Sequence, residues 1–177
     1  MNDKTNTPEE LLFQVDENDQ VIGAITKAQA NSHPEVFHRE VRVILFDEKR
    51  RILIQRRSPN KKVYPGVWAE TCQGHVSYGL SYEETAHKEL QEELGFDTSL
   101  KLIEKTLIKF PNETHFAAWF VGWYRGEKIK PEPAEVADYK FVDCQELAQL
   151  APQMIPSSWA KLWELQCSSA ASASALV

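Results

Sequence analysis

Residues 74–96, GHVSYGLSYEETAHKELQEELGF, carry the strongest structural signal in the chain. Ser81 can cap a helix through its hydroxyl group, and Glu84, three residues later, completes a capping box. Gly95 is a good C-terminal stop, because glycine tolerates the left-handed conformation in which many helices end. The stretch therefore predicts a helix that opens at Ser81 and closes at Gly95.

This helix has an apolar face and an acidic face. Its apolar positions recur every fourth residue and can pack on a sheet. They are Tyr82, Ala86, Leu90 and Leu94. Glu89, Glu92 and Glu93 fall on an adjoining face, with Cβ atoms roughly 5 to 6 Å apart, where like charges repel. For an isolated helix a solvated acidic face is the simpler interpretation, but a bound magnesium ion would also explain such a cluster of oxygen ligands.

The context of the glutamates favours the metal. A glycine-bearing loop, residues 73–79, leads into the capped helix. In this register the stretch resembles the Nudix box, G-x5-E-x7-R-E-U-x-E-E-x-G-U, where U is an aliphatic or similar apolar residue. Gly74 takes the first position, Glu89-Leu90 and Glu92-Glu93 take the two glutamate pairs, and Gly95-Phe96 ends the match.

Two positions depart from the box. Leu80 stands where the first glutamate belongs, which removes one carboxylate, and Lys88 stands where the arginine belongs. Lysine keeps the charge but loses the planar fork that arginine offers to carboxylates. The resemblance implies Glu89, Glu92 and Glu93 as ligands of Mg²⁺, or of Mn²⁺, and Glu89 and Glu92 as catalytic. We expect metal binding to be retained and catalysis to be weakened or altered.

The segment before the box, QRRSPNKKVYPGVW at residues 55–68, resembles the branch of this family that includes isopentenyl-diphosphate isomerase. Arg56, Arg57, Lys61 and Lys62 bring four cations upstream of the acidic helix, and a bound diphosphate needs countercharge beyond that of its metal. An ordinary basic loop is the alternative. We predict that these four residues bind the substrate.

The isomerase resemblance is incomplete at the residues that carry the chemistry. It requires a cysteine immediately before Gly74 as acid/base, where this chain has Gln73. Cys72 is one residue earlier, and successive side chains of a strand point to opposite faces, so we interpret it as a packed thiol. The histidine-rich metal site of the isomerases maps in part onto this chain. Its positions are Asn31, His38, His75, Glu113 and His115. His38, His75, Glu113 and His115 thus form a candidate second metal site.

Three functions follow from the resemblance. The first is an enzyme acting on acid anhydrides, a magnesium-dependent hydrolase of a nucleoside diphosphate linked to another group, in which water attacks phosphorus. Glu135 is an outside candidate for the general base. The second is an enzyme like isopentenyl-diphosphate isomerase, and the third is a protein that binds a nucleotide or diphosphate without turnover, which Leu80 and Lys88 leave room for.

The rest of the chain predicts an α/β fold, which the resemblance specifies as the Nudix α/β/α sandwich with a mixed β-sheet. Alternating or β-branched runs predict strands. They span residues 11–15, 21–25, 41–46, 52–55, 102–110, 115–124 and 136–142. Two further helices are expected near residues 144–150 and 157–166, the second with tryptophans that pack. We expect one Nudix domain over residues 11–167, a flexible N-terminus over 1–10, and a disordered tail over 168–177.

Composition limits the partners. With 177 residues and 42% hydrophobic residues the chain suits one domain, and its net charge of -6 offers no attraction to duplex nucleic acid or an anionic membrane. A small-molecule diphosphate is the expected partner, and a homodimer is left open. The three cysteines are an odd number without paired spacing, which argues against a disulfide framework and for a reducing compartment. A cytoplasmic location is the resulting expectation.

Overall fold

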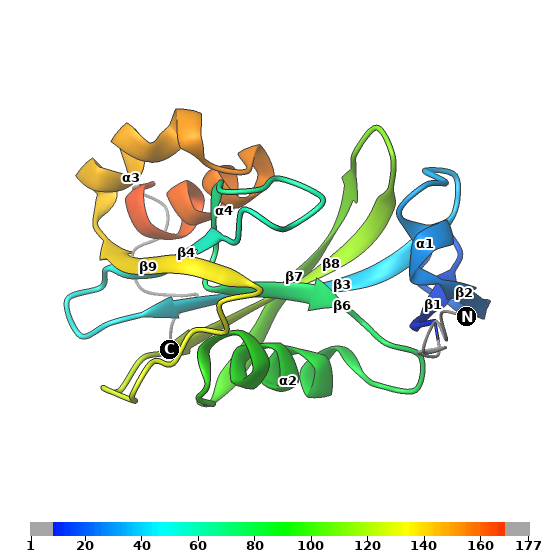
Figure 1. Cartoon of the computed structure of the whole chain (residues 1–177), viewed down its shortest axis with the longest axis horizontal. Coiled ribbons are helices and arrows are strands. Elements are labelled where there is room, and N and C mark those ends of the chain that lie inside the picture. Colours follow the sequence, from blue (N-terminus) through cyan, green and yellow to red (C-terminus); the bar gives the residue numbers. More distant parts are fainter. Residues whose placement is uncertain (1–8, 169–177) are drawn as a thin grey trace, which may run out of the picture.

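A mixed β-sheet runs through the middle of the molecule, with α2 on one side and α3 and α4 on the other (Figure 1). The structure is a computed structural model and describes residues 9–168. The elements are β1 (Leu11–Val15), β2 (Val21–Thr26), α1 (Lys27–Ala30), β3 (Phe37–Phe46), β4 (Ile52–Arg57), β5 (Trp68–Ala69), β6 (Cys72–His75), α2 (Tyr82–Leu94), β7 (Leu100–Lys109), β8 (Thr114–Trp123), β9 (Val136–Val142), α3 (Cys144–Leu150), the 3₁₀ turn η1 (Ala151–Gln153) and α4 (Pro156–Cys167). The predicted α/β/α arrangement with a mixed sheet is confirmed.

The long strand β3 organises the sheet. It pairs in parallel with β8 along its whole length and antiparallel with β1, β4 and β6. β4 continues to β9, and β8 continues to β7. Because β6 and β8 both pair with residues 40–43 in the middle of β3, residues far apart in the sequence meet there.

The helix α2 forms as its sequence predicts. The Ser81 side chain accepts from the Glu84 backbone amide, Glu84 accepts from the Ser81 amide, and Gly95 ends the helix at a φ of 77°. Its apolar stripe lies against the sheet, with Ala86, Leu90 and Leu94 fully buried in one core cluster. The stripe fixes the rotation of the helix and thereby the direction in which its glutamates point.

The helix α4 covers the opposite face. Leu162 and Leu165 are buried in the second large core cluster, and the indole rings of Trp159 and Trp163 stack at 5.5 Å beside it. The tryptophans therefore pack, as predicted. Sequence reasoning did not foresee α1, β5 or β6, which are too short to show a period. Of the predicted termini, 1–10 and 168–177, only residues 9, 10 and 168 are within the described part of the chain.

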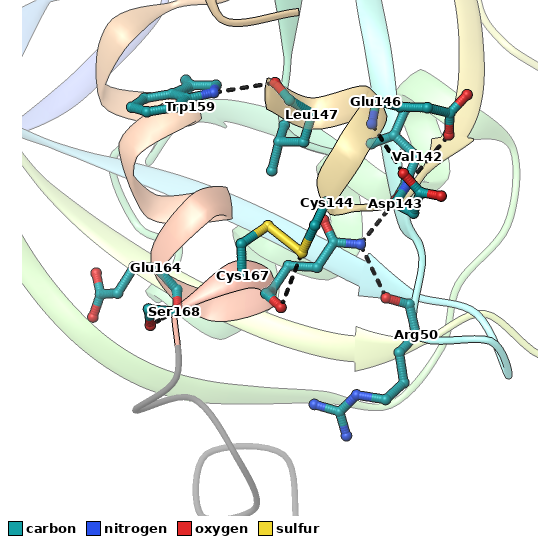
Figure 2. The surroundings of a disulfide bond; sticks show 11 residues. Arg50, Val142, Asp143, Cys144, Glu146, Leu147, Trp159, Glu164, Cys167 and Ser168 are labelled. Carbon is teal, nitrogen blue, oxygen red and sulfur yellow. Dashed lines mark hydrogen bonds between the residues drawn. A yellow bond between two sulfur atoms is a disulfide. The ribbon is translucent and has the colours of Figure 1, made fainter. Parts of the chain in front are cut away.

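A disulfide joins Cys144 to Cys167, so the expectation that the cysteines stay unpaired is wrong (Figure 2). The two residues are 23 positions apart and begin α3 and end α4 respectively, with Cα atoms 5.5 Å apart. Their sequence spacing gives no sign of this, because the packing of the two helices brings them together. The cysteine count therefore carries no inference about the compartment. Among the described residues no helix is long and apolar enough to cross a bilayer.

Candidate active site

A cavity of about 480 Å³ opens beside the first half of β3. Its volume is typical of small-molecule sites. Its walls come from α2, β6 and the N-terminal end of the chain, and from the loops that follow β4, β7 and β8. All three predicted helix glutamates line it, and so do the predicted residues Arg57, Lys61, Lys62, His75 and Glu113.

Gly74 lets the helix carboxylates reach this cavity. In β6, residues 72 and 74 face α2, and residues 73 and 75 face the other way. A Cβ atom at Gly74 would lie 2.2 Å from Cδ of Glu89, far closer than atoms can approach. The first position of the box therefore needs glycine because the Glu89 carboxylate occupies the space of a side chain.

Burial controls the charge of the helix carboxylates. It raises the pKa of Glu93 to about 8 and that of Glu89 to about 7. The negative charge of Glu89 further raises the pKa of Glu93, and that of Glu92 further raises the pKa of Glu89. Glu93 accepts a hydrogen bond of 2.7 Å from Nε2 of Gln55. Glu92 is exposed and pairs with Nζ of Lys88 at 2.9 Å. Glu93 is buried and Glu89 is partly buried, and two such carboxylates side by side offer oxygen ligands to a divalent ion.

Three of the four predicted cations line the cavity, and Arg56 does not. Because side chains alternate along β4, Gln55 and Arg57 are buried and Arg57 lines the cavity, while Arg56 is exposed and donates to the carbonyl oxygen of Gly66. This corrects the prediction for Arg56. The guanidinium of Arg57 donates to the carbonyl oxygen of Val63 at 3.0 and 3.2 Å, so it also fixes the loop that carries the two lysines.

A second group of ligand-type side chains adjoins the first. His38, His75 and Glu113 each offer a ligand atom within 4.8 Å of the others, because β3 pairs with both β6 and β8. Burial lowers the pKa of His38 to about 3 and that of His75 to about 4, which keeps both rings neutral. Within the described chain, neither ring nitrogen of His38 has a hydrogen-bond partner. Neutral imidazoles with a carboxylate suit manganese or zinc.

Of the four residues predicted for the second metal site, His115 lies outside the group of three, and Asn31 contacts one member of that group. The His115 ring contacts the carboxylate of Glu40 and is outside the group of three, although it lies 5.4 Å from the His38 ring. The side-chain oxygen of Asn31 lies 3.2 Å from Nε2 of His75. Asn31 therefore orients a member of the group.

Sequence reasoning missed a buried charge network on the floor of the cavity. Arg42 donates to Glu70 at 2.9 Å and to Glu40 at 3.2 Å, and all three side chains are buried. Burial raises the pKa of Glu40, but the charge of Arg42 and the contact with His115 outweigh it and hold that pKa well below its usual range. A signal was present, because Glu40 and Arg42 flank Val41 within a strand that continues as an apolar run, and charges in such a place are rarely buried unless paired.

Cys72 is the packed thiol that its position predicts. It is fully buried in the core cluster shared with Ala86 and Leu90 of α2. Burial raises the pKa of this thiol well above its usual value. Gln73, which occupies the position of the isomerase cysteine, lines the cavity instead. Among the described residues, no thiol lines the cavity.

Comparisons with known proteins agree with this architecture. A model of the NUDIX domain matches residues 36–160. The isopentenyl-diphosphate Delta-isomerase of Streptomyces coelicolor is 38% identical over 157 residues, which cover 84% of this chain and 79% of that protein. The isomerase of Burkholderia multivorans is 32% identical over 146 residues, which cover 80% of this chain and 82% of that protein.

Solved structures share the fold. The DR0079 protein of Deinococcus radiodurans superposes with a TM-score of 0.75 at 21% identity, covering 88% of this chain and 98% of that one. A MutT protein of Methanosarcina mazei gives 0.63 at 21% identity, covering 72% and 91%. Together with the match of the domain model, these likenesses mean that the chain belongs to the Nudix family and has relatives named isopentenyl-diphosphate isomerase.

Proposed function

We propose that this protein is a magnesium-dependent hydrolase of a phosphoanhydride, acting on a small diphosphate such as a nucleoside diphosphate linked to another group. The observation that carries the proposal is the composition of the cavity. It holds the carboxylates of Glu89, Glu92 and Glu93 opposite the cations of the loop after β4, and no thiol of the described chain lines it. Hydrolysis uses carboxylates and a metal, whereas the isomerase resemblance implies a cysteine.

The residues present fit a divalent ion. Glu89 and Glu93 offer oxygen ligands whose pKa values are raised mainly by burial, and a divalent ion would compensate their negative charge. A bound magnesium ion would neutralise charge on the diphosphate and lower the pKa of a coordinated water. Nζ of Lys88 lies 2.9 Å from the carboxylate of Glu92 and 3.8 Å from that of Glu89. Lys88 can therefore orient these carboxylates by ion pairing, as the resemblance implies for the arginine of the box.

The protein side chains would bind the substrate and accept a proton. Lys61 and Lys62 bind the diphosphate oxygens, while Arg57 holds their loop. Water attacks one phosphorus, an oxygen–phosphorus bond forms, and the bond from that phosphorus to the bridging oxygen breaks. Glu89 and Glu92 are the carboxylates that we propose as catalytic, and Glu135, which also lines the cavity, is a further candidate to accept the proton of the attacking water.

Isomerisation of isopentenyl diphosphate is the second candidate. The names of the relatives favour it over hydrolysis, and the group of His38, His75 and Glu113 is the part of the isomerase metal site that this chain retains. Gln73 opposes it. A protein that binds a diphosphate without turnover is the third candidate, because of Leu80 and Lys88.

The test is phosphorus NMR of the protein with magnesium and a panel of nucleotide sugars, nucleoside triphosphates and isopentenyl diphosphate. New phosphate resonances that are absent with Glu93→Gln would support the hydrolase and identify the substrate class. Unchanged phosphorus spectra together with dimethylallyl signals in the proton spectrum of the isopentenyl sample would replace it with the isomerase. Binding without any product would leave the third candidate.

A further inference from the structure

Most cations of the cavity already have an anionic or carbonyl partner. The pairs are Lys27 with Glu10, Arg42 with Glu40 and Glu70, Arg57 with the Val63 carbonyl, Lys61 with Glu135, and Lys88 with Glu92. Within residues 9–168, Lys62 is the one lining cation without such a partner. A diphosphate that binds more than one of these cations must therefore share a cation with a partner that the protein supplies, or displace that partner.

The pair of Lys61 and Glu135 spans the cavity between two loops. Lys61 lies in the loop between β4 and β5, and Glu135 directly precedes β9. Both side chains line the cavity, and Nζ of Lys61 contacts the Glu135 carboxylate. Both charges also act on Glu93, because Lys61 lowers its pKa and Glu135 raises it. The pair therefore lies beside the most buried carboxylate of α2.

The side chains of this pair can separate while their backbones stay fixed. The Ser58 amide donates to the Glu135 carbonyl oxygen at 2.8 Å, and the Lys61 amide donates to the Ser58 carbonyl oxygen at 3.1 Å. The side chains are 28% and 38% exposed. Ion pairs of that exposure are weak, since water screens them and two long side chains must be ordered. A ligand with more charge than one carboxylate can thus replace Glu135.

We infer that the Glu135 carboxylate competes with the substrate for Lys61. Glu135 pairs with Lys61 when no substrate is bound, and the diphosphate of the substrate replaces Glu135 in this pair. Glu135 thereby helps to determine specificity, because a ligand must bind Lys61 more strongly than a single carboxylate does. This inference rests on the proposed function only in taking a diphosphate as the ligand. It predicts that removing the charge of Lys61 weakens diphosphate binding, whereas removing the charge of Glu135 strengthens it.

Calorimetric titration with methylenediphosphonate and magnesium tests the inference, because the carbon bridge of this probe cannot be hydrolysed. Lys61→Ala should weaken binding about tenfold, as expected for the loss of a charge-assisted contact. Glu135→Gln should strengthen binding about two- to fivefold, which is the strength of a half-exposed ion pair. In Lys61→Ala the further change Glu135→Gln should have no effect, because the competition is then gone.

Glu104→Gln is the matched control. Glu104 pairs with Lys161 outside the cavity and is 37% exposed, almost as Glu135 is, so this change should leave binding unaltered. An equal gain from Glu135→Gln with and without Lys61 would mean a general charge effect and overturn the inference. Weaker binding in Glu135→Gln, or none by the unaltered protein, would also overturn it. Binding that follows the expected pattern without turnover of natural diphosphates would refute only the hydrolase.

Discussion

Gly74 shows how much of the site depends on one missing side chain. Gly74→Ala places a Cβ atom 2.2 Å from Cδ of Glu89, and β6 cannot retreat easily because Gly74 pairs with Val41 of β3. Glu89 must therefore move. We expect a loss of magnesium affinity of about tenfold but only a small loss of stability, because the atoms that must shift are the end of a flexible side chain. Calorimetry with magnesium and urea denaturation measure the two effects.

The control is Gly23→Ala on β2, where a Cβ atom would lie 3.4 Å from the nearest atom and the backbone needs no positive φ. That variant should bind magnesium as the unaltered protein does. If Gly74→Ala also retained full magnesium affinity, Glu89 would not be a ligand.

The buried Glu93 carboxyl makes the stability of the metal-free protein depend on pH. Its pKa is about 8 in the fold against an ordinary 4.5, so the folded state holds a proton that the unfolded chain releases. This contribution is fully present below about pH 4.5 and is lost as the pH rises through about 8. Urea denaturation in EDTA across this range should show a steeper fall for the unaltered protein than for Glu93→Gln. Parallel curves would mean that Glu93 is ionised in the fold.

The pairing of α3 with α4 illustrates what patterns within single elements cannot show. Both helices lie within one residue of their predicted ranges, and the structure adds that Asp143 caps α3. The disulfide between them follows from tertiary packing alone. It closes a loop of 23 residues, so its removal should cost roughly 3 kcal/mol on the chain-entropy account.

The double variant Cys144→Ser and Cys167→Ser should therefore unfold at lower urea concentration while keeping its magnesium affinity. Leu162 and Leu165 still anchor α4 in the core, and α4 lies on the other side of the sheet from the carboxylates of α2. A reducing agent provides the control, since it should lower the stability of the unaltered protein and leave the double variant unchanged. Loss of magnesium binding in the double variant would contradict this separation.

At the scale of the whole molecule, the sequence predicted what depends on local order and missed what depends on pairing. The box predicted α2 and the face on which its glutamates lie, because the N-cap, the apolar stripe and the C-terminal glycine all fall within one stretch. The network of Glu40, Arg42 and Glu70 needs the register between β3 and its neighbours, which no single stretch contains. The same holds for Arg56, whose face of β4 depends on where that strand begins.

The arrangement of the sheet predicts two metal ions per chain. Gly74 lies against Glu89 on the α2 side of β6, while His75 points to the other side and joins His38 and Glu113. Adjacent residues of one short strand therefore belong to two different ligand groups. The first offers only carboxylate oxygens and suits magnesium, whereas the second offers imidazoles and suits manganese or zinc.

Metal analysis of protein loaded with manganese and then dialysed tests this arrangement. The unaltered protein should hold two ions, Glu93→Gln and His38→Ala should each lose a different one, and the combined variant should hold none. Calorimetry should show that Glu93→Gln removes the magnesium site and that His38→Ala does not, because His38 belongs only to the second group. If either single change removed both ions, the two groups would form one shared site around β6, and the cavity would hold the diphosphate through a single cluster.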